Sequence, residues 1–257
     1  MSDTLINRIP PLVKNFGFGM FCLGATLALG VTVGSQSLGR AIANFKREPA
    51  TIQVKGVSEI AVVSDWGAWD ATVNARGTTL AETFATLEVG VEKLHAFILA
   101  NSFEEGDLIR LDVSTSTLYT QDKEGHSTNT IEGYRLSQSI VVHSSRVEAI
   151  RAISRRVTDL VRDGVEVSSG STVFRVSGLE AIKMALLEKA TQNAFERASL
   201  LAKGSGSGVG ELMSASQGVF QIVPLGSTDV SDWGISDTST IDKTVKAVVS
   251  LTYAIDS

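Results

Sequence analysis

The sequence has little cysteine and no excess of basic residues, and both shortages limit its functions. Its only cysteine, Cys22, stands in an apolar segment near the N-terminus. No disulfide can therefore form within the chain, and the rest of the sequence offers neither a cysteine-based metal site nor a thiol nucleophile. The 23 Lys and Arg residues are outnumbered by 28 Asp and Glu, which gives a formal net charge of -5. Because general nucleic-acid-binding proteins normally carry a basic face, we predict that nucleic acid is not a partner.

The sequence also lacks a group of residues with the spacing of a catalytic, cofactor or metal site. The histidines His95, His126 and His143 fall on a predicted helix, a polar loop and a strand end, and His95 has no His, Cys or carboxylate at ligand spacing. The glycine-rich run 204–210 follows a helix and precedes a strand, whereas a phosphate loop has the reverse order. We predict a protein that is not an enzyme and that has no cofactor and no metal site.

Charge is absent from residues 15–39, which no other part of the chain resembles. Their apolar part, the 18 residues 16–33, has the length at which a helix crosses a hydrocarbon core of about 30 Å. The alternative is a cleaved signal peptide, since Ala41-Ile42-Ala43 has the form of a cleavage site. An apolar run of this length exceeds the roughly 7–15 residues of a signal core. We therefore predict a tail over 1–14, a transmembrane helix over 15–39 and a linker over 40–49.

Small residues within this segment are spaced for close packing of membrane helices. Gly30 and Gly34 form a Gly-x-x-x-Gly pair, and Gly24 stands four residues before Ala28. Glycine is also frequent in membrane helices that do not associate, so the spacing alone leaves both interpretations open. Basic residues flank both ends of the segment, and counting them does not establish which side of the membrane the body occupies.

A folded body is predicted over residues 50–257, from alternating apolar residues in its strands and helical spacing between them. The strands are predicted near 51–56, 61–75, 109–119, 134–142, 165–176, 211–223 and 244–255. The helices are predicted near 79–98, 145–164 and 179–203, each opened by a capping box: Thr79 with Glu82, Ser145 with Glu148, and Ser177 with Glu180. This order predicts an α+β fold in which a mixed sheet is built from duplicated strand-helix-strand units.

Two surfaces of the body are candidates for contact with a partner. The outer face of the helix near 145–164 is basic and includes Arg151 and Arg155. Such a face is usually solvated, and the alternative is binding of an acidic partner or a lipid headgroup. The second candidate is the long polar loop 224–243, which carries Trp233. Loops of this length commonly have a function, such as an oligomer contact.

Several segments resemble the SIMPL domain family, formerly a domain of unknown function, which occurs in bacterial envelope proteins. The similar segments are Asp107–Ile109 leading to Tyr119, Gly133–Ser139, Phe195–Ala202 followed by Gly210–Leu212, and Val245–Tyr253, within a resemblance that spans about 51–255. The sequence departs from the family at Thr117 and at Ser64-Asp65, where the family often has proline; these differences concern turn geometry. No catalytic residues are established for the family, so the resemblance supplies none.

The resemblance implies an α/β body of duplicated strand-helix-strand units outside the cytoplasmic membrane. It also implies kinship with proteins that are linked to oxidative-stress tolerance and able to form large rings or cages. We therefore expect a single-pass inner-membrane protein with a periplasmic body that forms a non-enzymatic homo-oligomer. Its partners would be copies of itself and the lipid bilayer. The alternative is an envelope binding or chaperone-like protein that recognises another envelope protein or a small ligand through Arg151, Arg155 or Trp233.

Overall fold

The computed structural model describes residues 20–21, 23–32, 34–35 and 50–256, and it divides the chain into two units, Met1–Thr51 and Ile52–Ser257. In the first unit, residues 20–21, 23–32 and 34–35 are helical. Within the described part of the chain, no helix combines the length and the apolarity needed to cross a membrane. The predicted tail 1–14 and the predicted linker 40–49 lie outside the described residues. So do residues 15–19, 22, 33 and 36–39 of the predicted transmembrane helix.

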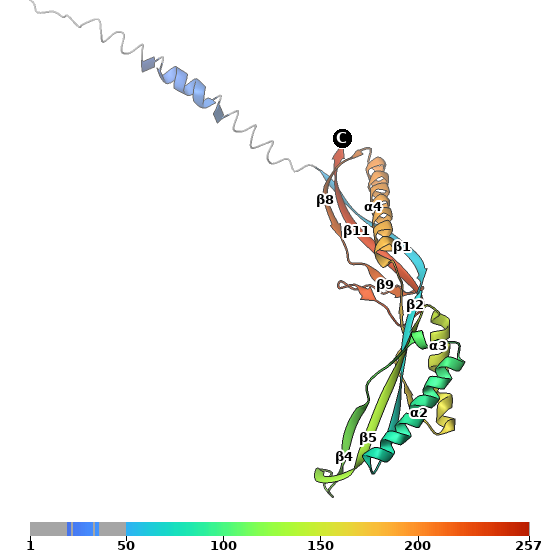
Figure 1. The fold of residues 1–257 in the computed structure, drawn as a ribbon. Helices are drawn as coiled ribbons and strands as arrows, with labels where there is room; N and C mark the ends of the chain where they lie inside the picture. Colours follow the sequence, from blue (N-terminus) through green and yellow to red (C-terminus); the bar gives the residue numbers. More distant parts are fainter. Residues whose placement is uncertain (1–19, 22, 33, 36–49, 257) are drawn as a thin grey trace, which may run out of the picture. The chain divides into compact units, whose positions relative to one another are not determined.

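The second unit contains a five-stranded sheet that packs on one long helix (Figure 1). Its strands run in the order β1-β11-β9-β10, and β8 also pairs with β11. The bounds are β1 (Thr51–Val63), β8 (Gly208–Gln217), β9 (Gln221–Pro224), β10 (Ile235–Ser236), β11 (Asp242–Asp256) and helix α4 (Leu179–Gly204).

Small residues allow α4 to approach this sheet closely. Ala190, Ala194 and Ala198 on the helix are completely buried. A Cβ atom added at Gly56 of β1 would overlap the carbonyl oxygen of Ala190 and crowd the side chain of Ala194. The sheet contributes Val245, Val249 and other alternate residues of β11 to the same core. The period-2 pattern of β11 and the alanine stripe of α4 therefore determine which faces meet.

A six-stranded sheet forms the rest of the unit, in the order β3-β5-β2-β6, with β4 pairing to β5 and β7 to β2. Helices α2 and α3 lie on one side of β2 and β5 (Figure 1). The bounds are β2 (Trp66–Gly77), α2 (Leu80–Ala100), η1 (Glu105–Asp107), β3 (Leu108–Arg110), β4 (Ser114–Gln121), β5 (Ser127–Ser144), α3 (Val147–Arg156), η2 (Val157–Asp163), β6 (Glu166–Ser169) and β7 (Val173–Arg175).

The predicted α+β class is confirmed, although the strands form two sheets rather than one. The predicted strand 165–176 is interrupted into β6 and β7 at Gly170, where the carboxylate of Asp70 occupies the space that a side chain would need. The predicted strand 211–223 is likewise divided into β8 and β9, and β8 begins earlier, at Gly208 within the glycine-rich run 204–210.

Of the three predicted capping boxes, one is present in its N-cap half. Thr79 caps α2 and accepts a hydrogen bond from the backbone N–H of Glu82 at 3.3 Å. The other two predictions are wrong, because α3 begins after Arg146 and α4 after Gly178, neither with a side-chain cap. Ser177 donates its hydroxyl to Asp65 instead, at 2.9 Å, so a tertiary contact replaces the expected local one.

Candidate functional site

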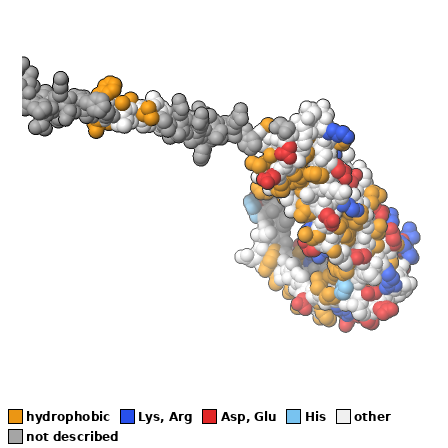
Figure 2. Space-filling model, turned by 90° about the horizontal axis from the view of Figure 1, so that it is seen from above, with side chains coloured by type: hydrophobic (Ala, Val, Ile, Leu, Met, Phe, Trp, Pro, Cys, Tyr) orange, Lys and Arg blue, Asp and Glu red, His pale blue; other side chains and the backbone are white. Residues whose placement is uncertain are grey.

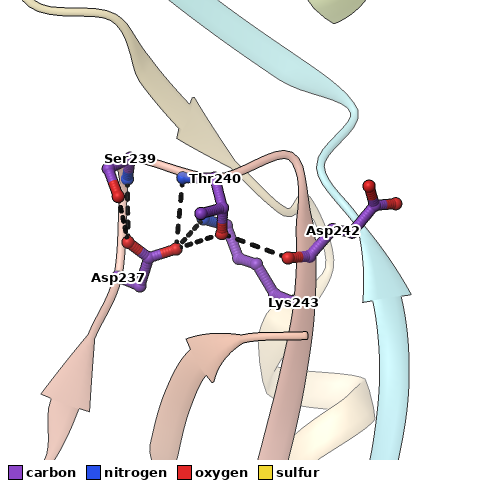
Figure 3. A network of polar contacts seen from close by, with 5 residues as sticks. All are labelled: Asp237, Ser239, Thr240, Asp242 and Lys243. Atoms are coloured by element: carbon purple, nitrogen blue, oxygen red, sulfur yellow. Dashed lines mark hydrogen bonds and ion pairs between the residues drawn. The ribbon is translucent and has the colours of Figure 1, made fainter. Parts of the chain in front are cut away.

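The loop between β9 and β11, residues 225–241 (the Trp233 loop), is anchored by a buried ion pair. Asp237 accepts a hydrogen bond from Lys243 Nζ at 2.9 Å, and the Lys243 side chain is 2% exposed. Asp237 also accepts hydrogen bonds from the backbone N–H of Ser239 at 3.0 Å and of Thr240 at 3.2 Å, and from both of their hydroxyls (Figure 3). The end of the loop is thus held to the start of β11.

These contacts keep the Asp237 carboxylate ionised. Burial alone raises the pKa of this carboxyl, but hydrogen bonds from Lys243, Thr240 and Ser239 outweigh it and lower the pKa well below the usual 3.8. A buried carboxylate and a buried ammonium are stable only as a pair with good geometry. The network therefore makes the position of the loop dependent on two side chains.

The same region joins the two sheets. The N–H of Phe174 on β7 donates to Thr238 of the loop at 2.7 Å, and the N–H of Ser64 donates to Ile241 at 2.9 Å. A cavity of about 160 Å³ lies between these segments, with Lys243 and Asp237 in its lining. Its other lining residues are Phe174, Arg175, Val176, Leu179, Ile222 and Ser236. The base of the Trp233 loop is consequently hydrogen-bonded to segments of both sheets.

The tip of this loop exposes apolar side chains. Trp233 is 94% exposed, and Val230 near it is also largely exposed, as is Leu225 at the start of the loop. Gly234 follows Trp233 with φ of +83° and donates to the carbonyl of Ser231 at 3.1 Å, which forms a tight turn. The tip therefore combines defined turn geometry with a large aromatic surface in water, a combination that is typical of contact residues.

A second apolar surface lies on α4 beside the edge strand β1. Leu200 and Leu201 are 72% and 58% exposed and line a groove of about 460 Å³ with Val54, Gln53, Lys55 and Arg197 (the α4 groove). Arg197 donates to the carbonyl of Lys55 at 3.1 Å, and neither cation has a carboxylate partner among residues 50–256. In the view of Figure 2, hydrophobic side chains are spread over the body among interspersed charges of both signs.

The predicted basic face of α3 is largely neutralised. Arg151 pairs with Glu148, Arg146 pairs with Asp107 at 2.9 Å, and Asp159 lies near Arg156 and Arg162. Arg155 is exposed and has no partner in the part of the chain that the structure describes. No contact in the structure brings Arg151 or Arg155 together with Trp233, because α3 packs on the six-stranded sheet.

The predicted membrane-packing residues Gly24, Ala28, Gly30 and Gly34 all lie on the described helical residues of the first unit and are exposed. At the three glycines, nothing lies within 4 Å of the position that a Cβ would take.

Two groupings of titratable residues were missed by the sequence analysis. His95 Nε2 lies 3.0 Å from Glu105, a carboxylate ten residues away that becomes adjacent only after the chain turns at η1. At the β4–β5 hairpin, Asp122, Glu124 and His126 place one ligand atom each within 4.8 Å of one another, and all three are exposed. Such exposed groups are common without a metal ion, and the signal for this one was the short spacing Asp-x-Glu-x-His.

The folded body matches the model of a known protein family. The family model described as SIMPL, a protein of unknown function (DUF541), matches residues 52–253, which covers both sheets and the Trp233 loop. No curated protein matches the chain.

Proposed function

The chain belongs to the SIMPL family of proteins of unknown function, and from this premise we propose that it is a membrane-anchored envelope protein that assembles with copies of itself. The assembly is a ring or cage with a structural or stress-protective role and no catalytic one. The single observation that carries the proposal is the exposed Trp233 on a loop whose base is held by the buried Asp237–Lys243 pair. A side chain that is 94% exposed on an anchored loop fits a contact with another molecule.

The surface that suits this loop is the α4 groove of a second copy. Asp229 and Asp232 flank the exposed tip of the loop, whereas Lys55 and Arg197 border the exposed leucines of the groove. Apolar surface would therefore meet apolar surface inside a rim of opposite charges, which favours correct docking. Because the loop and the groove are different surfaces, the contact is head to tail, and head-to-tail contacts generate rings when the rotation closes.

The anchor completes the proposal. The charge-free segment 15–39 holds each copy in the inner membrane, with the body in the periplasm, and Gly24, Ala28, Gly30 and Gly34 allow neighbouring helices to approach. We also propose that the body is built from duplicated strand-helix-strand units, because each of the two sheets packs against helices of its own. Many copies fixed to one surface need only a modest contact energy to assemble, since tethering raises their effective concentration.

Disulfide trapping tests the contact in the full chain. In a Cys22→Ser background, Trp233→Cys combined with Leu200→Cys is expected to give disulfide-linked ladders of the detergent-solubilised protein under mild oxidation. The matched control places the second cysteine at Leu212, which is 52% exposed on β8, outside the groove. Equal cross-linking of the two pairs would refute the head-to-tail contact.

The second candidate function is an envelope binding or chaperone-like protein that uses the same loop on a different partner. The groove of about 540 Å³ beside Trp233, lined in part by Phe220 and Lys183, favours this reading. Cross-linking of Trp233→Cys to another envelope protein, without ladders of the chain itself, would support it.

A further inference from the structure

The face of the six-stranded sheet opposite α2 and α3 carries two arginines side by side. Register pairs Ala75 of β2 with Leu136 of β5, and both side chains are buried against the helices. The next pair is Arg76 with Arg135. Because side chains alternate between faces along a strand, these arginines point to the face that the helices leave open. Figure 1 shows β2, β5 and β4 with α2 and α3 on one side only.

Direct opposition of two positive charges destabilises a sheet unless something neutralises them. Cβ atoms of directly opposite residues are about 4.5–5.5 Å apart. Neither Arg76 nor Arg135 forms an ion pair or a side-chain hydrogen bond with any residue of the described body. Moreover, Nε of Arg135 is buried without a hydrogen-bond partner. An N–H that has lost water and gained no acceptor is unfavourable. The terminal nitrogens of both guanidinium groups also have no acceptor in the described body, and these are the donors that remain open to a ligand.

Neighbouring strands add further polar groups to the same face. Ser116 of β4 is directly opposite Arg135, so one cross-strand row contains a hydroxyl and two guanidinium groups. The adjacent row contains Ser114, Ser137 and Asn74. Glu166 on β6 pairs with Asn74, and its carboxylate is not within ion-pair distance of either arginine. The row is thus rich in hydrogen-bond donors at the point where the positive charges meet.

We propose that Arg76 and Arg135 form a binding site for an oxyanion, with Ser116 as an additional donor. The geometry suits a tetrahedral phosphate group, because two guanidinium groups can each donate two parallel hydrogen bonds to its oxygens. Such a group neutralises the opposed charges of the two guanidinium groups. Inorganic phosphate and the phosphodiester of a lipid headgroup present the same chemistry. The site lies on a different sheet from the Trp233 loop and does not depend on the proposed assembly.

Thermal unfolding of the full chain in detergent, at constant ionic strength, tests the site. Inorganic phosphate is expected to raise the Tm of the wild type in a saturable manner, as any ligand that binds only the folded state does. Arg76→Gln and Arg135→Gln are each expected to weaken the affinity by about 10- to 100-fold, the effect of losing one charge-assisted hydrogen-bonding group. Arg135→Lys retains the charge but not the planar fork, and is expected to bind more weakly than the wild type.

Two controls separate binding from general effects of charge. Arg155→Gln removes an unpaired arginine of α3 that has no arginine opposite it, and it is expected to leave the phosphate response unchanged. In phosphate-free buffer, Arg76→Gln is expected to keep or raise the Tm, because it removes a repulsion. The proposal is overturned if phosphate does not raise the wild-type Tm, or if Arg76→Gln/Arg135→Gln gives the same rise.

The source of the phosphate is distinguished by a second titration with glycerophosphoglycerol, the water-soluble headgroup of an anionic lipid. Tighter binding of this diester than of inorganic phosphate, lost in the double variant, assigns the site to a lipid headgroup. Tighter binding of inorganic phosphate than of the diester, with binding lost in the double variant, assigns the site to a free phosphate. Failure of both ligands to bind contradicts the site itself.

Discussion

Removal of the Lys243 ammonium is the sharpest perturbation of the Trp233 loop. Lys243→Met retains most of the side-chain volume but leaves the Asp237 carboxylate, 10% exposed, without its cation. Breaking a buried pair in this way costs about 3–5 kcal/mol, because the remaining charge stays uncompensated. In a body of this size 1 kcal/mol corresponds to about 2–4 °C, so we expect Tm to fall by roughly 6–20 °C.

The energetic coupling between Asp237 and Lys243 is measured by urea unfolding of Lys243→Met, Asp237→Asn and the double variant, all at one protein concentration. Asp237→Asn removes the charge and keeps one side-chain oxygen, whereas Ser239 and Thr240 bond different oxygens of Asp237, so the double variant is expected to recover only part of the loss. Lys183→Met is the matched control: its pair with Glu180 is on the surface of α4, and its loss is expected to cost about 0–1 kcal/mol. Strict additivity of the two single changes would refute the reasoning.

Two other predictions concern the same unit. The pKa of the Asp237 carboxyl is lower in the folded state than in the unfolded state. Its contribution to folding stability is therefore fully present above about pH 4 and is lost as pH falls through the folded pKa. Acid unfolding of the wild type should show this loss of stability, and acid unfolding of Asp237→Asn should not. Gly56→Ala is expected to destabilise the α4 layer by about 1–3 kcal/mol, measured by urea unfolding, because its Cβ overlaps Ala190. Gly204→Ala, where nothing lies within 4 Å, should be neutral or stabilising, and equal losses at the two positions would contradict this packing.

The sequence predicted those parts of the fold that depend on local periodicity. Helix α2 with its Thr79 cap, and the alternation of β11, are present where the pattern placed them, although Leu80 and Phe84 at the start of α2 are about half exposed. The prediction failed where contacts between residues distant in the sequence determine the local structure. Ser177 turns to Asp65 rather than to its own helix, and Gly170 interrupts a strand because Asp70 lies against it.

The candidate site was predictable only in part. Trp233 was predicted as a candidate contact residue because a large aromatic stood in a long polar loop; the structure places it 94% exposed, and its contact role stays a prediction. The buried pair below it was not identified, since Lys243 stands at a polar loop-to-strand boundary where lysine is normally exposed. Opposition of Arg76 and Arg135 depends on the register of two strands that are distant in sequence, which no local pattern specifies.

The mass of the detergent-solubilised full chain tests the central proposal most directly. Light scattering that separates the protein from its detergent should give a discrete multiple of 27.3 kDa at micromolar concentration. Trp233→Ser, on an exposed tip where it removes no core packing, should shift this species towards the monomer. A wild-type protein that is monomeric under these conditions would contradict the proposal that the chain functions as an assembly.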